Sequence, residues 1–298
     1  MPKFNPPKKN TKKSKSSMKK NIANSAITTT IIEPRKGWIP IDLKEIWNYR
    51  ELLYFLAKRD IKVRYKQTVL GGLWAIIQPV LTMIVFTLFF GRLAKMPSDG
   101  IPYPIFVYVG LLPWTYFANA LSASGNSLVG SANLITKVYF PRLIVPVSAS
   151  LAGLLDFFIA MLVLGVMMIY YQFVPGVGLL LFPFLVGLTF LCAVGVGLWL
   201  SAFNVQYRDI RYVIPFLIQL WLFVSPVIYP VSIVNEKYRW LLALNPMGGV
   251  IKAYRASILG HLPIDWFLLG ISTAVILLIF FAGLYYFRRM ERYFADVI

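Results

Sequence analysis

Residues 177–203 read VGLLLFPFLVGLTFLCAVGVGLWLSAF and contain no charged side chain. A helix that crosses the roughly 30 Å hydrocarbon layer of a bilayer needs about 20 apolar residues, because each residue advances it by about 1.5 Å. This stretch is long enough, and it is one continuous uncharged block rather than an amphipathic stripe. It therefore predicts a transmembrane helix.

Five further apolar blocks, separated by charged or turn residues, predict five more spans. They are residues 70–90, 104–121, 143–171, 212–228 and 266–287. The whole chain is 58% hydrophobic and 14% charged, whereas soluble domains run near 45–50% and 25%. The expected fold class is an all-α integral membrane protein with six transmembrane helices.

Lysine and arginine are divided unevenly between the segments that separate these spans. With both termini inside, 24 of the 30 basic residues lie in cytoplasmic segments, namely 1–66, the two loops near Lys137 and Arg211, and the tail after 287. Cytoplasmic segments of membrane proteins carry such an excess. We therefore expect a multi-pass protein of the cytoplasmic (inner) membrane with both termini cytoplasmic.

The first 66 residues are expected to form two further parts. Residues 1–36 hold ten Lys or Arg and one Glu, half of the net charge of +18, which predicts a disordered basic tail. This tail is either simply solvated or attracted to anionic lipid, and nucleic-acid binding is the least expected role. Residues 37–66 begin with a capping-box pattern at Asp42 and Glu45 and predict an amphipathic helix in the cytoplasmic interface. A soluble helix packed on a partner is the alternative.

Residues 67–298 are expected to form the six-span domain, with an outer hairpin at 235–263. A break at Asn245, Pro246, Met247 and Gly248 divides the hairpin into two apolar legs that are too short to cross a bilayer. We expect a re-entrant helical hairpin on the outer side. The break is the candidate outer gate, either as a lid that tilts or as a rigid cap.

Residues that carry catalysis or bind metals are scarce in this chain. Cys192 and His261 are the single cysteine and histidine, and the spans hold no paired carboxylates. The sequence has no Gly-Lys dipeptide and so no Gly-Lys-Ser/Thr phosphate loop. We expect no catalytic site, no metal site and no cofactor on this chain. If ATP and Mg²⁺ drive it, they bind a separate subunit.

Two kinds of residue inside the predicted spans are candidate functional residues. Asp156 is the single charge within a span, and an intramembrane carboxylate is costly enough to suggest function. Its alternative is a protonated or hydrogen-bonded acid packed against a neighbouring helix. Mid-span aromatic faces suit the C–H faces of sugar rings, although plain helix packing is the commoner reason for them. The candidate path residues are Phe86, Phe89, Phe90, Phe216, Trp221 and Phe223.

Several short segments together resemble one family. They are GLLPWTYF at 110–117, NLITKVYFPR at 133–142, NVQYRDIR at 204–211, SPVIYP at 225–230 and LNPM at 244–247. They look like the corresponding segments of type-2 ABC transporter permeases, above all of the branch that exports O-antigen, capsule and teichoic-acid polymers. The resemblance covers about residues 40–298, and the run from Lys137 to Arg142 is its most specific motif.

The resemblance implies a transporter subunit rather than an enzyme. Its expected partners are a second copy of itself, two ATP-binding cassette subunits that hydrolyse ATP with Mg²⁺, a lipid-linked glycan and membrane lipids, with no nucleic acid. The expected ATPase-coupling residues are Leu134, Ile135, Lys137, Val138, Tyr139, Phe140 and Arg142. Two alternatives remain: the same architecture exporting drugs or small lipids, or a membrane-embedded enzyme that modifies glycans.

Overall fold

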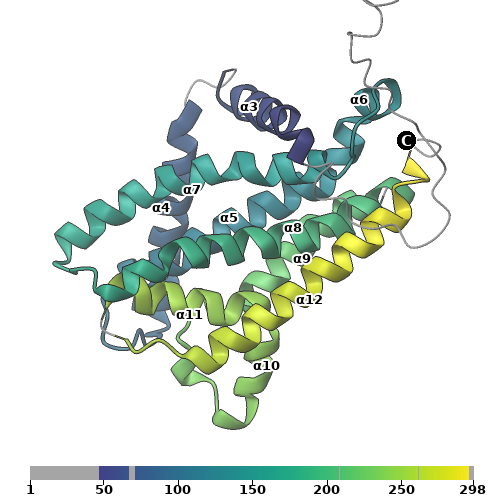
Figure 1. The fold of residues 1–298 in the computed structure, drawn as a ribbon. Helices are drawn as coiled ribbons and strands as arrows, with labels where there is room; N and C mark the ends of the chain where they lie inside the picture. The colour runs from purple at the N-terminus through teal and green to yellow at the C-terminus, as the bar shows by residue number, and fades with distance from the viewer. Residues whose placement is uncertain (1–46, 67–70, 208, 261, 295–298) are drawn as a thin grey trace, which may run out of the picture. The chain divides into compact units, whose positions relative to one another are not determined.

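The structure is a computed structural model that describes residues 47–66, 71–207, 209–260 and 262–294. All of them belong to one compact unit, Pro40–Ile298. Every regular element in these ranges is a helix (Figure 1), which confirms the all-α class. The predicted tail 1–36, the capping box at Asp42 and Glu45, and the rest of 37–46 lie outside the described residues.

Five helical stretches in the described part of the chain are long and apolar enough to cross a membrane. They are Gly71–Leu93, Tyr103–Gly130, Ile144–Tyr170, Val177–Gln206 and Trp266–Met290. In Figure 1 they correspond to α4 (Trp74–Phe86) with the π-helix η2 (Thr87–Leu93), α5 (Tyr103–Gly130), α7 (Ile144–Tyr170), α8 (Phe182–Gln206) after the 3-10 helix η3 (Val177–Leu181), and α12 (Trp266–Met290). The predicted span 212–228 gives a shorter helix, α9 (Ile210–Val224).

Helix α5 is the centre of the bundle. Its residues from Ile105 to Trp114 are all buried, and α4, α7, α8, α9 and α11 (Pro246–Leu259) pack against it. The Tyr108 hydroxyl donates to the carbonyl of Ala160 on α7 at 2.9 Å. Lipid tails are as apolar as leucine, so packing and interhelical hydrogen bonds of this kind hold membrane helices together.

Helices α8 and α12 approach each other closely at two glycines. A Cβ atom on Gly283 would lie 2.5 Å from the carbonyl oxygen of Gly195, and one on Gly195 would lie 2.8 Å from the Cα atom of Phe280. Any larger side chain at either position would force the two backbones apart. Small residues serve the same purpose at many membrane helix contacts.

The segments between the spans gather at two ends of the bundle. At one end, α3 (Arg50–Lys66) and α6 (Ala132–Lys137) share an apolar cluster with the start of α7 and the ends of α8 and α12. At the other end, α11 reaches the loop that joins α7 to α8, where Ser257 donates to the carbonyl of Gly178.

In its described residues, the predicted hairpin at 235–263 contains two α-helices, α10 (Arg239–Leu244) and α11, with the break at Asn245. Helix α11 differs from expectation in its burial, because every residue except Lys252 is buried. Its small residues allow this burial because they let α12 approach closely. At Gly249 the backbone N–H donates to the Ser272 hydroxyl of α12 at 3.1 Å. Helix α11 is thus part of the core.

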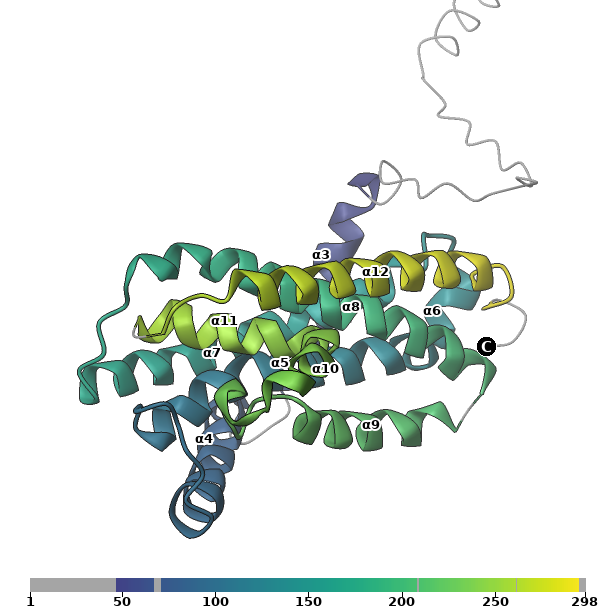
Figure 2. The same ribbon diagram turned by 90° about the horizontal axis from the view of Figure 1, so that it is seen from below.

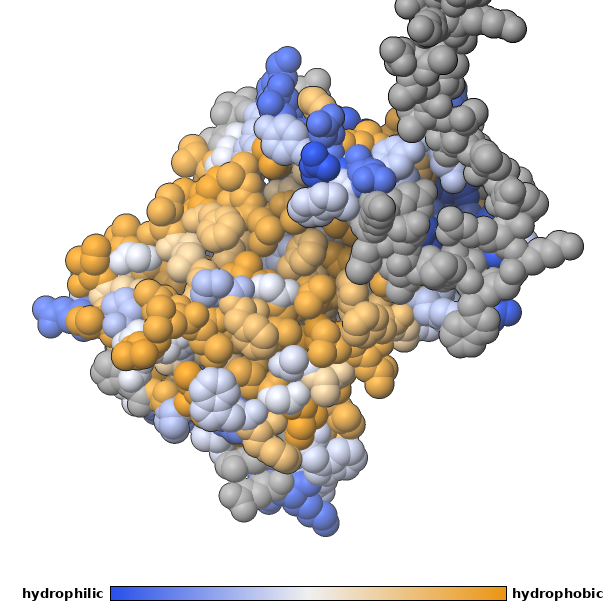
Figure 3. Space-filling view, viewed as in Figure 1, coloured by the Kyte–Doolittle hydropathy of each residue, from blue (hydrophilic) through white to orange (hydrophobic). Residues whose placement is uncertain are grey.

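The surface of the molecule is strongly apolar. In Figure 3 hydrophobic side chains cover the middle of the viewed face, over α7, α8 and α12, and hydrophilic ones gather at α3 and at the tip beside α10. The outer faces of α4 and α9 are also apolar, and each helix has a single buried residue, Pro79 and Ile214 respectively. Such surfaces need lipid or another apolar partner.

Candidate functional site

The predicted coupling residues lie on α6 and on the segment that follows it. Helix α6 ends at Lys137, and Val138 adopts extended backbone angles. Val138 and Tyr139 are exposed, with 52% and 69% of their surface accessible. Together with the exposed Lys137 they form a short projection at the end of the bundle, which we call the 137–139 ridge.

The remaining predicted coupling residues anchor this ridge rather than expose an apolar patch. Ile135 and Phe140 are buried in the apolar cluster that also contains Leu56. The Arg142 backbone N–H donates to the Glu291 carboxylate at 2.9 Å, and its guanidinium donates to the Glu291 carbonyl. The five apolar coupling residues were expected to be exposed, and this is wrong for Ile135 and Phe140, which point into the bundle.

The six predicted path aromatics divide between two helices that flank α5 on the same side (Figure 2). On α4 and η2, Phe86 and Phe90 are half-buried and contact each other edge to face, with ring centroids 5.6 Å apart. Phe89 is exposed, as are Phe216 and Phe223 of α9. The structure thus leaves three aromatic faces open and uses Phe86 and Phe90 in packing.

Trp221, the sixth path candidate, is held in place by contacts within the bundle. Its ring packs against Phe117 of α5 with centroids 5.1 Å apart, and its indole N–H donates to Asn245 Oδ1 at 2.9 Å. These two contacts fix the position of the half-buried Trp221 ring, and its role in the path stays a prediction. Its link to Asn245 also ties α9 to the start of α11.

Asn245 is the hub of the predicted outer gate. Its Oδ1 also accepts from the Met247 N–H at 3.1 Å, which caps α11, and its Nδ2 donates to the Ser225 hydroxyl at 3.0 Å. Pro246, Met247 and Gly248 are all buried. These contacts favour a rigid cap over a tilting lid.

Arg255 is a functional candidate that the sequence reasoning missed, having counted it only as an outer charge. The side chain is 2% exposed. It donates to the carbonyl oxygens of Phe106 at 3.2 Å, Pro226 at 2.7 Å and Val227 at 2.7 Å, and it lies 3.7 Å from the Phe106 ring centroid. The signal in the sequence that could have identified it is the arginine itself, which lies at the centre of an apolar leg of the predicted hairpin.

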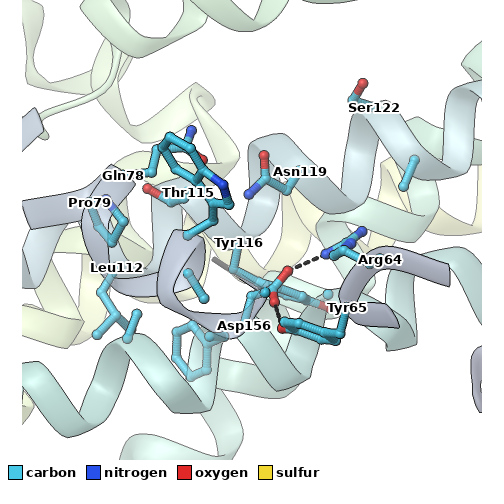
Figure 4. A pocket seen from close by; sticks show the side chains of 17 residues that line it. Arg64, Tyr65, Gln78, Pro79, Leu112, Thr115, Tyr116, Asn119, Ser122 and Asp156 are labelled. Atoms are coloured by element: carbon cyan, nitrogen blue, oxygen red, sulfur yellow. Dashed lines mark hydrogen bonds and ion pairs between the residues drawn. The ribbon is translucent and has the colours of Figure 1, made fainter. Parts of the chain in front are cut away.

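Asp156 lies on α7, and its carboxylate group points toward the end of α3 (Figure 4). Its carboxylate accepts from the guanidinium of Arg64 and from the hydroxyl of Tyr65. Burial raises the pKa of the Tyr65 phenol, and the hydrogen bond to Asp156 raises it further, so Tyr65 remains a donor. The acid therefore has two hydrogen-bond donors among the described residues. Its partners come from α3 and were not identified from the sequence.

Comparison with known proteins identifies relatives along most of the chain. A sequence model of the family described as ABC-2 type transporter matches residues 51–259. The chain is 33% identical over 258 residues to the O-antigen export system permease protein RfbA of Myxococcus xanthus, covering 84% of this chain and 97% of that protein. It is 28% identical over 260 residues to RfbA of Klebsiella pneumoniae (83% and 95%). It is 23% identical over 241 residues to the polysialic acid transport protein KpsM of Escherichia coli (79% and 92%).

Proposed function

This chain belongs to the ABC-2 type transporter family, and we propose that it is the permease subunit of an exporter that moves a lipid-linked polysaccharide across the cytoplasmic membrane. The observation that carries the proposal is the match with relatives named for O-antigen export and polysialic acid transport, which extends over 92–97% of their lengths. Energy comes from ATP hydrolysed with Mg²⁺ on separate ATP-binding subunits.

The ATP-binding subunits dock on the 137–139 ridge. Val138 and Tyr139 are exposed apolar side chains beside the Lys137 charge, a combination that fits a groove on a partner. The buried Phe140 and the contacts between Arg142 and Glu291 join the ridge to α7 and α12. A displacement of the ridge would therefore move the two membrane helices α7 and α12. Both termini lie on this cytoplasmic side.

The predicted span 212–228, which completes the six, consists of α9 together with the non-helical residues that follow it. Fifteen residues of helix reach only about 22 Å. Contacts with α5 nevertheless follow most of its length: Ile214 lies at Gly125, Trp221 at Phe117, and the carbonyl of Ile228 accepts from Tyr103. The segment thus runs along the central helix from one end to the other.

The polysaccharide path lies between two copies of this chain. Helix α4 with η2, and helix α9, flank α5 on one side, carry almost no buried residues and expose Phe89, Phe216 and Phe223. A second copy opposite this face would enclose a path with aromatic walls. Helices α10 and α11 form a re-entrant cap on its outer side, and α3 lies in the cytoplasmic interface among membrane lipids.

A deletion in the native host tests this proposal. Loss of the gene should remove the polymer from the cell surface and leave its lipid-linked form on the cytoplasmic leaflet, and a plasmid copy should restore export. A surface polymer that is unchanged in the deletion strain would exclude the proposed substrate. It would favour a transporter of drugs or small lipids.

A further inference from the structure

The bundle contains a cavity of about 440 Å³ next to the paired carboxylate of Asp156. Its walls come from α4, α5 and α7 and from the end of α3 (Figure 4). Clefts of about 300–1,000 Å³ are typical of small-molecule sites. The cavity lies within one copy of the chain.

Helix α5 presents a line of polar side chains to this cavity. Thr115, Asn119 and Ser122 follow one another at a spacing of four and three residues, which places them on one helix face. All three are half-buried. Among the described residues, none forms a hydrogen bond with these three side chains. Polar groups inside a membrane protein are costly unless they are paired, so this line of donors and acceptors points to a ligand.

The rest of the lining indicates which chemistry the ligand has. Gln78 adds an exposed amide, and Trp74 adds an aromatic face from the same helix, α4. Among the described residues that line the cavity, Arg64 is the one cation, and Asp156 already accepts from it. A phosphate would meet the negative charge of Asp156. Amides, hydroxyls and an aromatic face instead suit a neutral ring that carries several hydroxyl groups.

We propose that this cavity binds a neutral, hydroxyl-rich group the size of a sugar ring. Thr115, Asn119 and Ser122 would bond its hydroxyls, and Trp74 would cover one face of it. Two sources supply such a group: a sugar of the lipid-linked glycan, or the polyol head group of a phospholipid. Only the first source rests on the proposed export function.

Saturation-transfer NMR on the permease–ATPase complex in lipid nanodiscs tests the site. The probes are the methyl glycosides of glucose, galactose, mannose and N-acetylglucosamine. Saturation should pass from the complex to at least one of them. Thr115→Val with Ser122→Ala should weaken that binding about tenfold, because two hydrogen bonds are lost.

The matched control is Ser127→Ala with Thr273→Val. These hydroxyls bond the carbonyls of Ser124 and Leu269 within their own helices, at 2.7 and 2.8 Å, and they do not line the cavity. The control pair should bind the glycoside like the wild type. If the first pair does not assemble, Gln78→Leu replaces it, because its side chain is exposed.

Changing the nanodisc lipid distinguishes the two sources. Weaker glycoside binding in phosphatidylglycerol than in phosphatidylcholine discs would assign the site to the lipid head group, and equal binding would assign it to the glycan. Absence of transfer in both lipids, unchanged affinity in the cavity variants, or displacement by pyrophosphate would overturn the proposal. Normal polymer export without glycoside binding would contradict the proposed sugar site and leave the export function standing. Glycoside binding without export would count against the export function alone.

Discussion

Arg255 donates a hydrogen bond to the carbonyl oxygen of Val227 at 2.7 Å, and a second one of 2.7 Å reaches the carbonyl of Pro226. These carbonyls follow the end of α9, where the backbone has left the helix. A backbone carbonyl without a partner costs several kcal/mol in lipid. One buried guanidinium therefore pairs the carbonyls exposed after the end of α9, and it joins this segment to α11.

Arg255→Met should lower the free energy of unfolding by at least about 3 kcal/mol, because three carbonyls lose a donor at about 1–3 kcal/mol each. Lys252→Met is the matched control on the same helix. Lys252 pairs with Asp265 at 2.8 Å, and both are partly exposed, so its loss should cost about 1 kcal/mol or less. Thermal unfolding of the purified protein measures both. Equal losses would contradict the supporting role of Arg255.

Tyr139→Ala should reduce ATPase binding without destabilising the permease, because the Tyr139 side chain is exposed. Phe140→Ala should instead lower the free energy of unfolding by about 3–5 kcal/mol, because it empties a core position. Co-purification of the ATPase, measured alongside thermal stability, separates the two effects. A Tyr139→Ala protein that retains its ATPase and its export would remove the 137–139 ridge as the docking site.

Thiol labelling in a Cys192→Ala background tests the topology. Lys237→Cys should react with a membrane-impermeant reagent from outside the cell, and Lys137→Cys only after the membrane is opened, because both positions are exposed at opposite ends. Met247→Cys should stay unreactive in the folded protein because Met247 is buried. Labelling of Lys237→Cys from the cytoplasmic side alone would refute six spans with an outer hairpin.

Phe89→Leu and Phe216→Leu should slow polymer export and leave stability nearly unchanged, because both side chains are exposed and leucine keeps an apolar surface. Phe267→Leu and Phe281→Leu on α12 are matched controls with similarly exposed rings. Rates of polymer appearance at the cell surface provide the comparison. If all four variants export equally, these aromatics do not line the path.

Several boundaries of the fold are predictable from the sequence because charged and turn residues mark them. The helix after residue 143 ends at Tyr170, within one residue of expectation. The predicted span 212–228 instead ran past the end of α9 at Val224, although proline disfavours helical angles at the residue before it and Ser225 precedes Pro226. Helix α5 extends further than expected, to Gly130, and Asn126 and Ser127 in this extension donate to carbonyls of their own helix, at 2.8 and 2.7 Å.

The candidate sites are less predictable because they depend on contacts between distant residues. Asp156 was recognised as a costly intramembrane acid, but Arg64 lies 92 positions earlier and no local pattern joins the two. The same holds for Arg255, whose partner Phe106 is 149 positions away. The division of the coupling residues into exposed and buried sets follows from the apolar cluster that Ile135 and Phe140 share with α3, α7, α8 and α12, which their spacing does not encode.

Transport into sealed inside-out vesicles tests the central claim most directly. The vesicles contain this chain and its ATPase, and the lipid-linked polymer starts on their outer, cytoplasmic leaflet, where a membrane-impermeant glycosidase digests it. With ATP and Mg²⁺ the polymer should become protected from the enzyme, and without ATP, or with an ATPase that cannot hydrolyse it, the polymer should remain digestible. Polymer that stays fully digestible with ATP and an active ATPase present would contradict the account.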